Sequence, residues 1–131
     1  MHKSIEISSA PESLHLVEKI IDEMTEKHQI ESDLYGKILV ATIEAVNNAI
    51  IHGNKSDVEK KVSIDIDANG NAMKIRIKDE GEGFDYKKVP DPTAPENIEN
   101  IHGRGVFLMT KLSDDIKFNK NGTEVEMTFK L

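Results

Sequence analysis

The sequence contains no cysteine, no excess of positive charge and no long hydrophobic run. Without cysteine the chain can form no disulfide, no thiolate nucleophile and no cysteine-ligated zinc site. Its 17 basic and 24 acidic residues give a formal charge of −7. This balance argues against nucleic acid or an anionic membrane as a partner, because both require a concentrated basic face. The longest apolar runs, such as Ile38–Ala41, are far below the ~18 residues of a membrane span.

What is present is typical of one soluble domain. A chain of 131 residues predicts a single domain over residues 1–131. Apolar residues make up 37% and charged residues 31%, which is the balance of a globular protein. Met1–Ser4 starts no apolar stretch of the kind found in signal peptides. We therefore expect a cytoplasmic protein.

The N-terminal third predicts a strand followed by two helices. Ile5 and Ile7 lie on one face of the strand, and Ser9 with Glu12 forms a capping-box pattern for a helix that ends near His28. The second helix is expected from about Ser32 to His52, with Gly53 closing it. Residues 38–51 are apolar nearly all round, which predicts a helix buried on every side.

Four polar residues interrupt that apolar stretch, Thr42, Glu44, Asn47 and Asn48, and two of them, Glu44 and Asn48, share one face of the helix. Glu44 and Asn48 are four residues apart, hence one turn apart. A buried carboxylate beside a buried amide is costly unless the two are paired or face a wet pocket. They are therefore candidates for a functional site.

A hairpin follows, with Asn69-Gly70-Asn71 as its turn. Apolar residues alternate with charged ones over residues 61–68 and 73–78, and the two outward rows carry opposite charge. Asp79 continues the apolar row of the second strand. If the strand persists, this carboxylate points toward the core.

The remainder contains two glycine motifs around a segment without periodicity. Gly81-Glu82-Gly83 breaks the strand, and residues 86–102, with Pro90, Pro92 and Pro95, are expected to be either disordered or a functional lid. Gly103-Arg104-Gly105 leads into a short helix expected at 106–112. Strands are expected at 116–118 and 123–131, and Thr123 is the one polar residue on the inner row of the last strand.

This order of elements predicts an α+β fold. It is a two-layer sandwich in which a mixed or antiparallel sheet carries about three helices on one face. If the sheet and helices pack in this way, the chemistry-bearing residues should converge.

Each of these residues also has an ordinary explanation. A helical Glu is usually solvated or paired, an Asp at a strand end is usually a turn cap, and Gly-x-Gly pairs mostly serve turns. His52 and His102 flank the glycines and could be ligands, but surface positions are the better interpretation for both. The joint pattern is more informative than its parts.

Together the residues fit the binding of a nucleoside triphosphate. Asn48 offers a neutral oxygen ligand for Mg²⁺, and Glu44 could accept a proton from an attacking hydroxyl. Asp79 could accept a hydrogen bond from an exocyclic amine such as that of adenine. Glycine backbones can approach phosphates closely, and Gly105 is expected at a helix start, where free amides attract anions.

Four motifs in order resemble a known superfamily. Residues 44–53 resemble the N box of the Bergerat-fold, histidine-kinase-like ATP-binding proteins, and Asp79–Phe84 resembles their Asp-x-Gly-x-Gly box. Residues 103–109 resemble their second glycine box, and Gly122-Thr123 their last motif. The whole chain most closely resembles the anti-sigma factor serine kinases of bacterial partner-switching systems.

The resemblance implies a role for each matching position. Asn48 would bind Mg²⁺, Glu44 would be the catalytic base, and Asp79 would read the adenine amino group of ATP with Thr123 nearby. The nucleotide pocket and lid hinges would be shaped by Gly81, Gly83, Gly103 and Gly105. Arg104 lies inside a glycine box, where a phosphate contact is expected of it.

The implied function is an ATP-dependent serine/threonine protein kinase that acts as an anti-sigma factor. Its partners would be a STAS-domain antagonist, which it phosphorylates, and a sigma factor, and it would form a homodimer. Histidine kinases usually carry Asn at the position of Glu44 and need a dimerisation domain missing here. The alternatives are an ATP-gated binding module without catalysis, and a structural domain in which Glu44 and Asn48 pair in the core.

Overall fold

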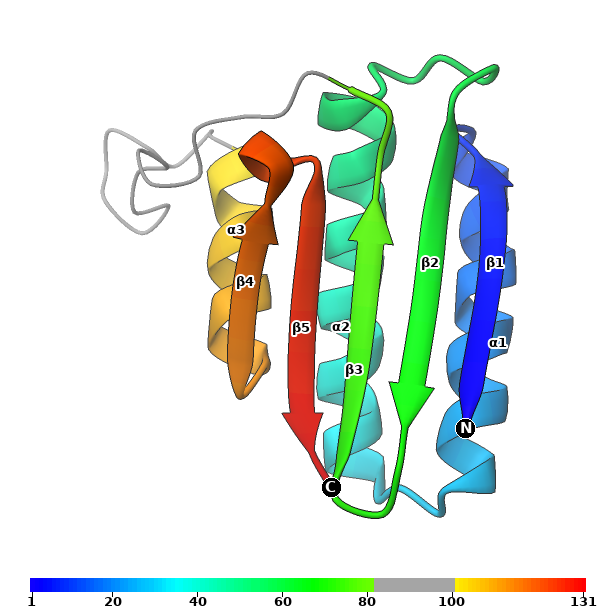
Figure 1. Ribbon diagram of the computed structural model, residues 1–131, viewed down its shortest axis with the longest axis vertical. Coiled ribbons are helices and arrows are strands. Elements are labelled where there is room, and N and C mark those ends of the chain that lie inside the picture. Colours follow the sequence, from blue (N-terminus) through cyan, green and yellow to red (C-terminus); the bar gives the residue numbers. More distant parts are fainter. Residues whose placement is uncertain (82–100) are drawn as a thin grey trace.

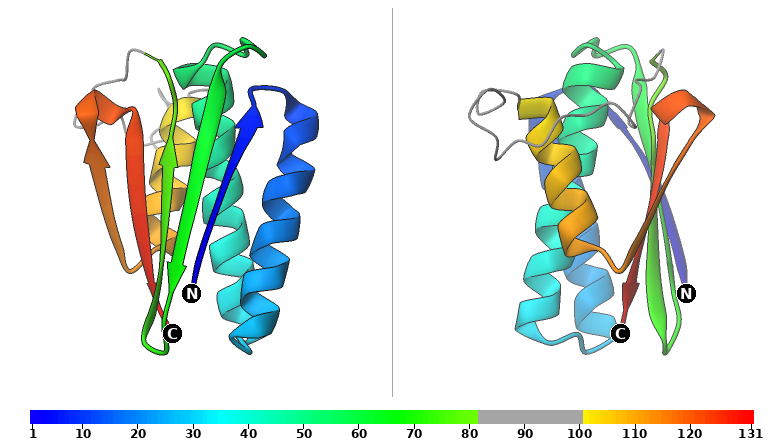
Figure 2. Two further views of the ribbon diagram at one scale, coloured as in Figure 1. Left: turned by 45° about the vertical axis from the view of Figure 1, so that its right-hand side comes forward. Right: turned by 90° about the vertical axis from the view of Figure 1, so that its left-hand side faces the viewer.

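The computed structural model describes residues 1–81 and 101–131, without the side chains of 101–104 and 121. In these ranges a five-stranded sheet is covered on one face by three helices (Figures 1 and 2). The strand order is β1-β2-β3-β5-β4, and each neighbouring pair is antiparallel. The predicted α+β two-layer fold is confirmed. Its strands are β1 (His2–Ser8), β2 (Lys61–Ala68), β3 (Ala72–Lys78), β4 (Asp115–Asn119) and β5 (Glu124–Lys130).

The helices are α1 (Leu14–Lys27), α2 (Ser32–Asn48) and α3 (Ile101–Leu112). Helix α2 lies between the other two, and a single π-helical turn, Ala49–Gly53, continues it toward the upper end in Figure 1. This placement brings the end of α2 next to the end of β3.

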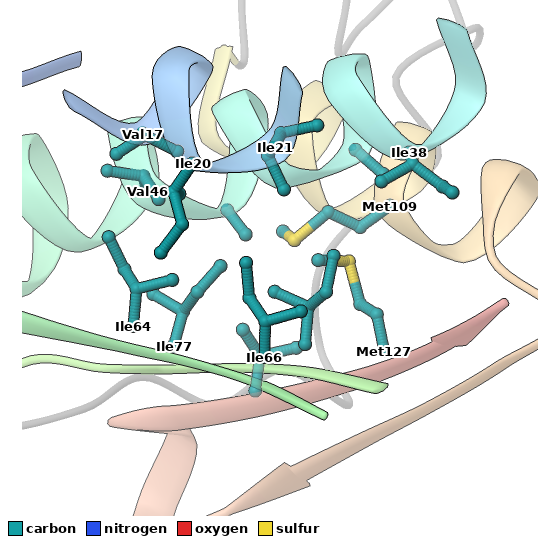
Figure 3. Close-up of a cluster of buried hydrophobic side chains, with 14 of the residues drawn as sticks. Val17, Ile20, Ile21, Ile38, Val46, Ile64, Ile66, Ile77, Met109 and Met127 are labelled. Atoms are coloured by element: carbon teal, nitrogen blue, oxygen red, sulfur yellow. The ribbon is translucent and has the colours of Figure 1, made fainter. Parts of the chain in front are cut away.

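The core lies between the sheet and the helices (Figure 3). The alternation predicted for β2 and β3 is confirmed, because Ile64, Ile66 and Ile77 are buried toward the helices. Fully buried Val17 and Ile21 of α1 meet this row from the other layer. The outer face of the sheet carries the predicted pairs of opposite charge, such as Asp65 opposite Arg76. Exposed pairs of this kind add little stability, so the inner layer holds the fold together.

The capping box predicted at Ser9 and Glu12 is wrong. A 3-10 turn, Pro11–Ser13, precedes α1, and no side chain caps either helix start. Ser9 is fully buried, donates to the carbonyl oxygen of Lys60 at 2.8 Å and accepts from Asn54 Nδ2 at 2.8 Å. A buried hydroxyl must find partners where the fold supplies them, and here they come from a distant part of the chain.

The expectation that α2 is buried all round is also wrong. Val40 and Ile51 are 44% and 45% exposed, because α2 is covered by the sheet and by its two neighbouring helices but not on its outer side. By length and composition alone, Ser32–Gly53 is long and apolar enough to cross a membrane, but 39% of its most apolar 18-residue stretch is buried inside the protein. The core helix of a soluble protein passes the same test.

Helix α3 begins earlier than predicted. It starts at Ile101, so Gly103 and Gly105 lie within its first two turns and Gly105 is not at its start. The amide of Gly105 is thus beyond the four free N–H groups of the helix terminus. Thr123 was expected to begin the last strand, but β5 begins at Glu124 and Thr123 follows a 3-10 turn.

Replacing Gly36 by alanine is expected to stabilise the protein by about 1 kcal/mol. Gly36 lies inside α2, and a Cβ built there meets no atom within 4 Å. The gain comes from the higher helix propensity of alanine. Urea denaturation of both proteins measures it, and an equal or lower free energy of unfolding for Gly36→Ala would contradict the prediction.

Candidate functional site

A pocket opens where the end of α2, the end of β3 and the turn before β5 meet. It brings together three predicted site residues: Asn48 from α2, Asp79 after β3 and Thr123 before β5. Its other walls are mainly apolar. They are formed by Ala45, Ala49, His52, Gly53, Ile77, Met109, Phe118, Gly122 and Val125.

Asp79 is the buried carboxylate of this pocket. It is 8% exposed, and its position on the inner row confirms the expectation from strand alternation. Its N–H donates to the carbonyl oxygen of Thr123 at 2.9 Å, which extends the β3–β5 pairing by one bond. Its Oδ1 accepts from the Gly81 N–H at 2.8 Å. Burial raises the pKa of Asp79, and the Gly81 N–H and Lys60 oppose this shift.

Two glycines allow the chain to pack tightly around Asp79. A Cβ on Gly53 would overlap the Asp79 carboxyl group, and a Cβ on Gly81 would overlap the carbonyl oxygen of Gly53. These are close approaches that glycine alone permits. Gly53 was not predicted as a site residue. Its position as the last residue of the N-box resemblance was the available signal.

Glu44 and Asn48 meet α3 at Gly105. A Cβ on Gly105 would lie 3.2 Å from Glu44 Oε2 and 3.3 Å from Asn48 Oδ1. The buried Nδ2 of Asn48 has no hydrogen-bond partner within the described residues. An unpaired buried amide is costly, and such groups commonly mark a place for a ligand or water. Glu44 adjoins the pocket at Asn48 without lining it.

Thr123 contributes to the site mainly through its backbone. Its hydroxyl donates to the carbonyl oxygen of Lys120 at 2.9 Å, while its own carbonyl accepts from Asp79. The hydroxyl oxygen still has acceptor capacity. Thr123 therefore pairs with the backbone of Asp79 and lines the same pocket.

For most of the remaining predicted residues the structure describes little or nothing of the surroundings. Gly83 and residues 86–100 of the expected lid lie outside the described residues. Gly103 and Arg104 are described as part of helix α3, but not their surroundings. His52 lines the pocket with much of its surface exposed, and the partial burial of its ring lowers its pKa. Within the described part of the chain no three His, Asp or Glu residues form a metal-binding cluster.

Sequence reasoning missed Asn54. This side chain is fully buried and makes hydrogen bonds to Ser9, Lys61 and Glu80. An Asn directly after a glycine at a helix end reads as an ordinary turn residue. Its partners are separated from it by up to 45 residues, so no local pattern could reveal them.

An antiparallel five-stranded sheet, three helices on one face and a pocket between the central helix and the sheet define a Bergerat-type sandwich. Comparison with protein families agrees, because residues 7–129 match the histidine kinase-like ATPase domain. The chain belongs to this family.

Its relatives include several bacterial proteins called serine-protein kinase RsbW. The chain is 34% identical to that of Oceanobacillus iheyensis over 61% of its own length and 54% of the relative's. It is 24% identical to that of Bacillus subtilis, over 95% of this chain and 82% of the relative, and 23% identical to that of Listeria innocua, over 98% and 87%. The resemblance inferred from the four motifs is confirmed.

Proposed function

We propose that this chain binds ATP in the pocket between α2 and the sheet and transfers the γ-phosphate to a serine or threonine of a partner protein. The observation that carries the proposal is the buried carboxylate of Asp79 in an apolar pocket shared with the unpaired amide of Asn48. Family membership and relatives called serine-protein kinases support it.

The adenine would lie at the Asp79 end of the pocket. The carboxylate would accept a hydrogen bond from the exocyclic amine, with Thr123 nearby, directly or through a water. Ile77, Met109 and Val125 supply apolar walls of the kind that bury a planar ring. Within the described residues Asp79 takes a side-chain hydrogen bond from Gly81 alone, which leaves its carboxylate able to accept another.

The phosphates would extend toward Glu44, Asn48 and α3. The site there suits Mg²⁺, because the amide oxygen of Asn48 is a hard ligand and Mg²⁺ takes few protein ligands beside phosphate and water. Asn48 would hold the ion through its Oδ1, while its unpaired Nδ2 is a hydrogen-bond donor and would donate to a phosphate oxygen. Bound Mg²⁺ would neutralise phosphate charge, which a chain of net charge −7 does not otherwise do.

The glycines of the two boxes would shape the pocket. Gly81 does so by packing against Gly53, and Gly105 by leaving space beside Glu44 and Asn48. The sequence predicted that Gly105 contributes a free backbone amide. Because Gly105 lies inside α3, its proposed contribution is the space beside Glu44 and Asn48 instead. The pocket and hinge roles of Gly83 and Gly103, and the phosphate contact of Arg104, remain part of the proposal.

Glu44 would act as the catalytic base. Its carboxylate lies beside Asn48 on α2 and would accept the proton of the attacking hydroxyl. Phosphoryl transfer depends mostly on positioning and on charge neutralisation, so a small domain with these groups suffices.

The proposed substrate is a STAS-type antagonist of an anti-sigma factor, and the second partner is a sigma factor. We also propose a cytoplasmic homodimer with no role in binding nucleic acid or membranes. The experiment is transfer of ³²P from ATP to a purified cognate STAS protein, and label on a serine or threonine is expected. Tight binding of ATP without labelled product would instead favour a nucleotide-gated binding module.

Removing divalent ions with EDTA is expected to weaken ATP binding sharply. Without the cation, the phosphates would meet the carboxylate of Glu44 and the negative charge of the chain with no neutralising partner. Calorimetry with and without EDTA measures the effect. Adenosine, which has no phosphates, serves as the control and should bind equally in both buffers. Equal ATP affinities would contradict the assignment of a metal to Asn48.

A further inference from the structure

Asn54 does not line the pocket, but it directly follows Gly53, which does. It follows the π-helical turn that ends α2, and its own N–H donates to the carbonyl oxygen of Ala49 at 2.8 Å. Its side chain is 0% exposed. A fully buried amide of this kind has to satisfy its donors and its acceptor inside the protein.

The side chain of Asn54 meets that demand by joining three strand ends. Nδ2 donates to Ser9 Oγ, just after β1, at 2.8 Å and to the carbonyl oxygen of Lys61, at the start of β2, at 3.0 Å. Oδ1 accepts from the N–H of Glu80, just after β3, at 2.8 Å. Each polar atom of the amide is therefore used.

Glu80 is the residue between Asp79 and Gly81, so this last bond acts on the turn that carries the pocket carboxylate. A second link holds the same residue, because Glu80 Oε2 accepts from the Lys61 N–H at 2.5 Å. Gly81 in turn packs on Gly53, the neighbour of Asn54. The turn at residues 79–81 thus packs on residues 53–54. Gly53 provides the space for it, and Asn54 provides a hydrogen bond to it.

The orientation of the Asp79 side chain depends on this turn. Its Oδ1 is fixed by the Gly81 N–H, whose position follows from that of Glu80. We propose that Asn54 is a positioning residue that aims the Asp79 carboxylate at the exocyclic amine of a purine, so that it sets the preference of the pocket for that base. This inference rests on the proposed function.

The test compares ATP with purine riboside triphosphate, which carries hydrogen in place of the amino group. A hydrogen bond to a carboxylate predicts that the wild type binds ATP about tenfold or more tightly than the analogue. In Asn54→Ala the affinity for ATP is expected to fall until this ratio is close to one. The affinity for the analogue should change less than twofold, because the analogue makes no bond that Asn54 positions.

Two further variants separate positioning from general stability. Thr25→Ala removes another buried polar side chain, inside α1 and away from the pocket, and should leave the ratio of the two affinities unchanged. Glu80→Ala removes an exposed side chain and its bond to Lys61, so it should fold even if Asn54→Ala does not. With one of the two links to Glu80 lost, it should reduce the ratio partially.

The outcomes are distinct. If the wild type binds neither triphosphate, or binds both equally, the proposed function of Asp79 fails and the inference fails with it. If the wild type prefers ATP but Asn54→Ala and Glu80→Ala keep that preference, the positioning role is overturned while ATP binding stands. If Thr25→Ala also loses the preference for ATP, the effect of Asn54→Ala is one of general stability, and the positioning role is overturned.

Discussion

The Glu44→Gln protein is expected to transfer phosphate at least about a hundredfold more slowly than the wild type, because it lacks the proposed base for the hydroxyl proton. Its affinity for ATP should stay close to that of the wild type. Glutamine has nearly the same shape as glutamate. In addition, Glu44 does not line the pocket but lies beside Asn48, which does. Single-turnover transfer of ³²P to the STAS substrate measures the rate, and calorimetry measures ATP binding.

A matched control is Glu26→Gln, the same substitution at an exposed position of α1. It should transfer phosphate at the wild-type rate. Transfer by Glu44→Gln at that rate would show that Glu44 is not the base. Loss of both transfer and ATP binding would instead assign Glu44 to the nucleotide pocket.

The second large effect is expected for Gly81→Ala. The new methyl group would overlap the carbonyl oxygen of Gly53, and a backbone atom cannot rotate away as a side chain can. The turn has to shift, at a cost of about 1–3 kcal/mol in the free energy of unfolding. Because the Gly81 N–H holds Asp79, ATP binding should weaken by about tenfold or more as that charge-assisted geometry is lost.

Gly36→Ala is the control for this variant, because it makes the same substitution where a Cβ meets nothing. It should bind ATP as the wild type does and unfold at higher urea. Titration with ATP and urea denaturation of the two variants provide the comparison. Wild-type stability and affinity in Gly81→Ala would show that the contact between residues 53 and 81 does not constrain the site.

Much of the sheet could be predicted because its signals are local. The turn at residues 69–71 and the period of two in β2 and β3 fix which side chains face the helices, and this parity alone placed Asp79 inward. The spacing of Glu44 and Asn48 likewise follows from the helical repeat. These features depend on neighbours along the chain.

The errors arose where distant segments decide the outcome. Ser9 matches a helix cap in sequence, but the fold buries it against Lys60 and Asn54, about 50 residues away. Gly105 marks a helix start by composition, yet α3 begins four residues earlier and uses the glycine to approach α2. Tertiary contacts overrode local preference in both cases.

Helix α2 and the turn that continues it also set the scale of the site. Asn48 is the last residue of α2, and the Gly53–Asn54 pair that supports the Asp79 turn lies at the far end of the π-helical turn that follows it. Only this turn, Ala49–Gly53, separates the two positions along the chain. The distance between the proposed metal-binding end of the site, at Asn48, and its proposed adenine end, supported by Gly53 and Asn54, is therefore set by this one turn. A tilt of α2 would move both ends together and leave their separation unchanged.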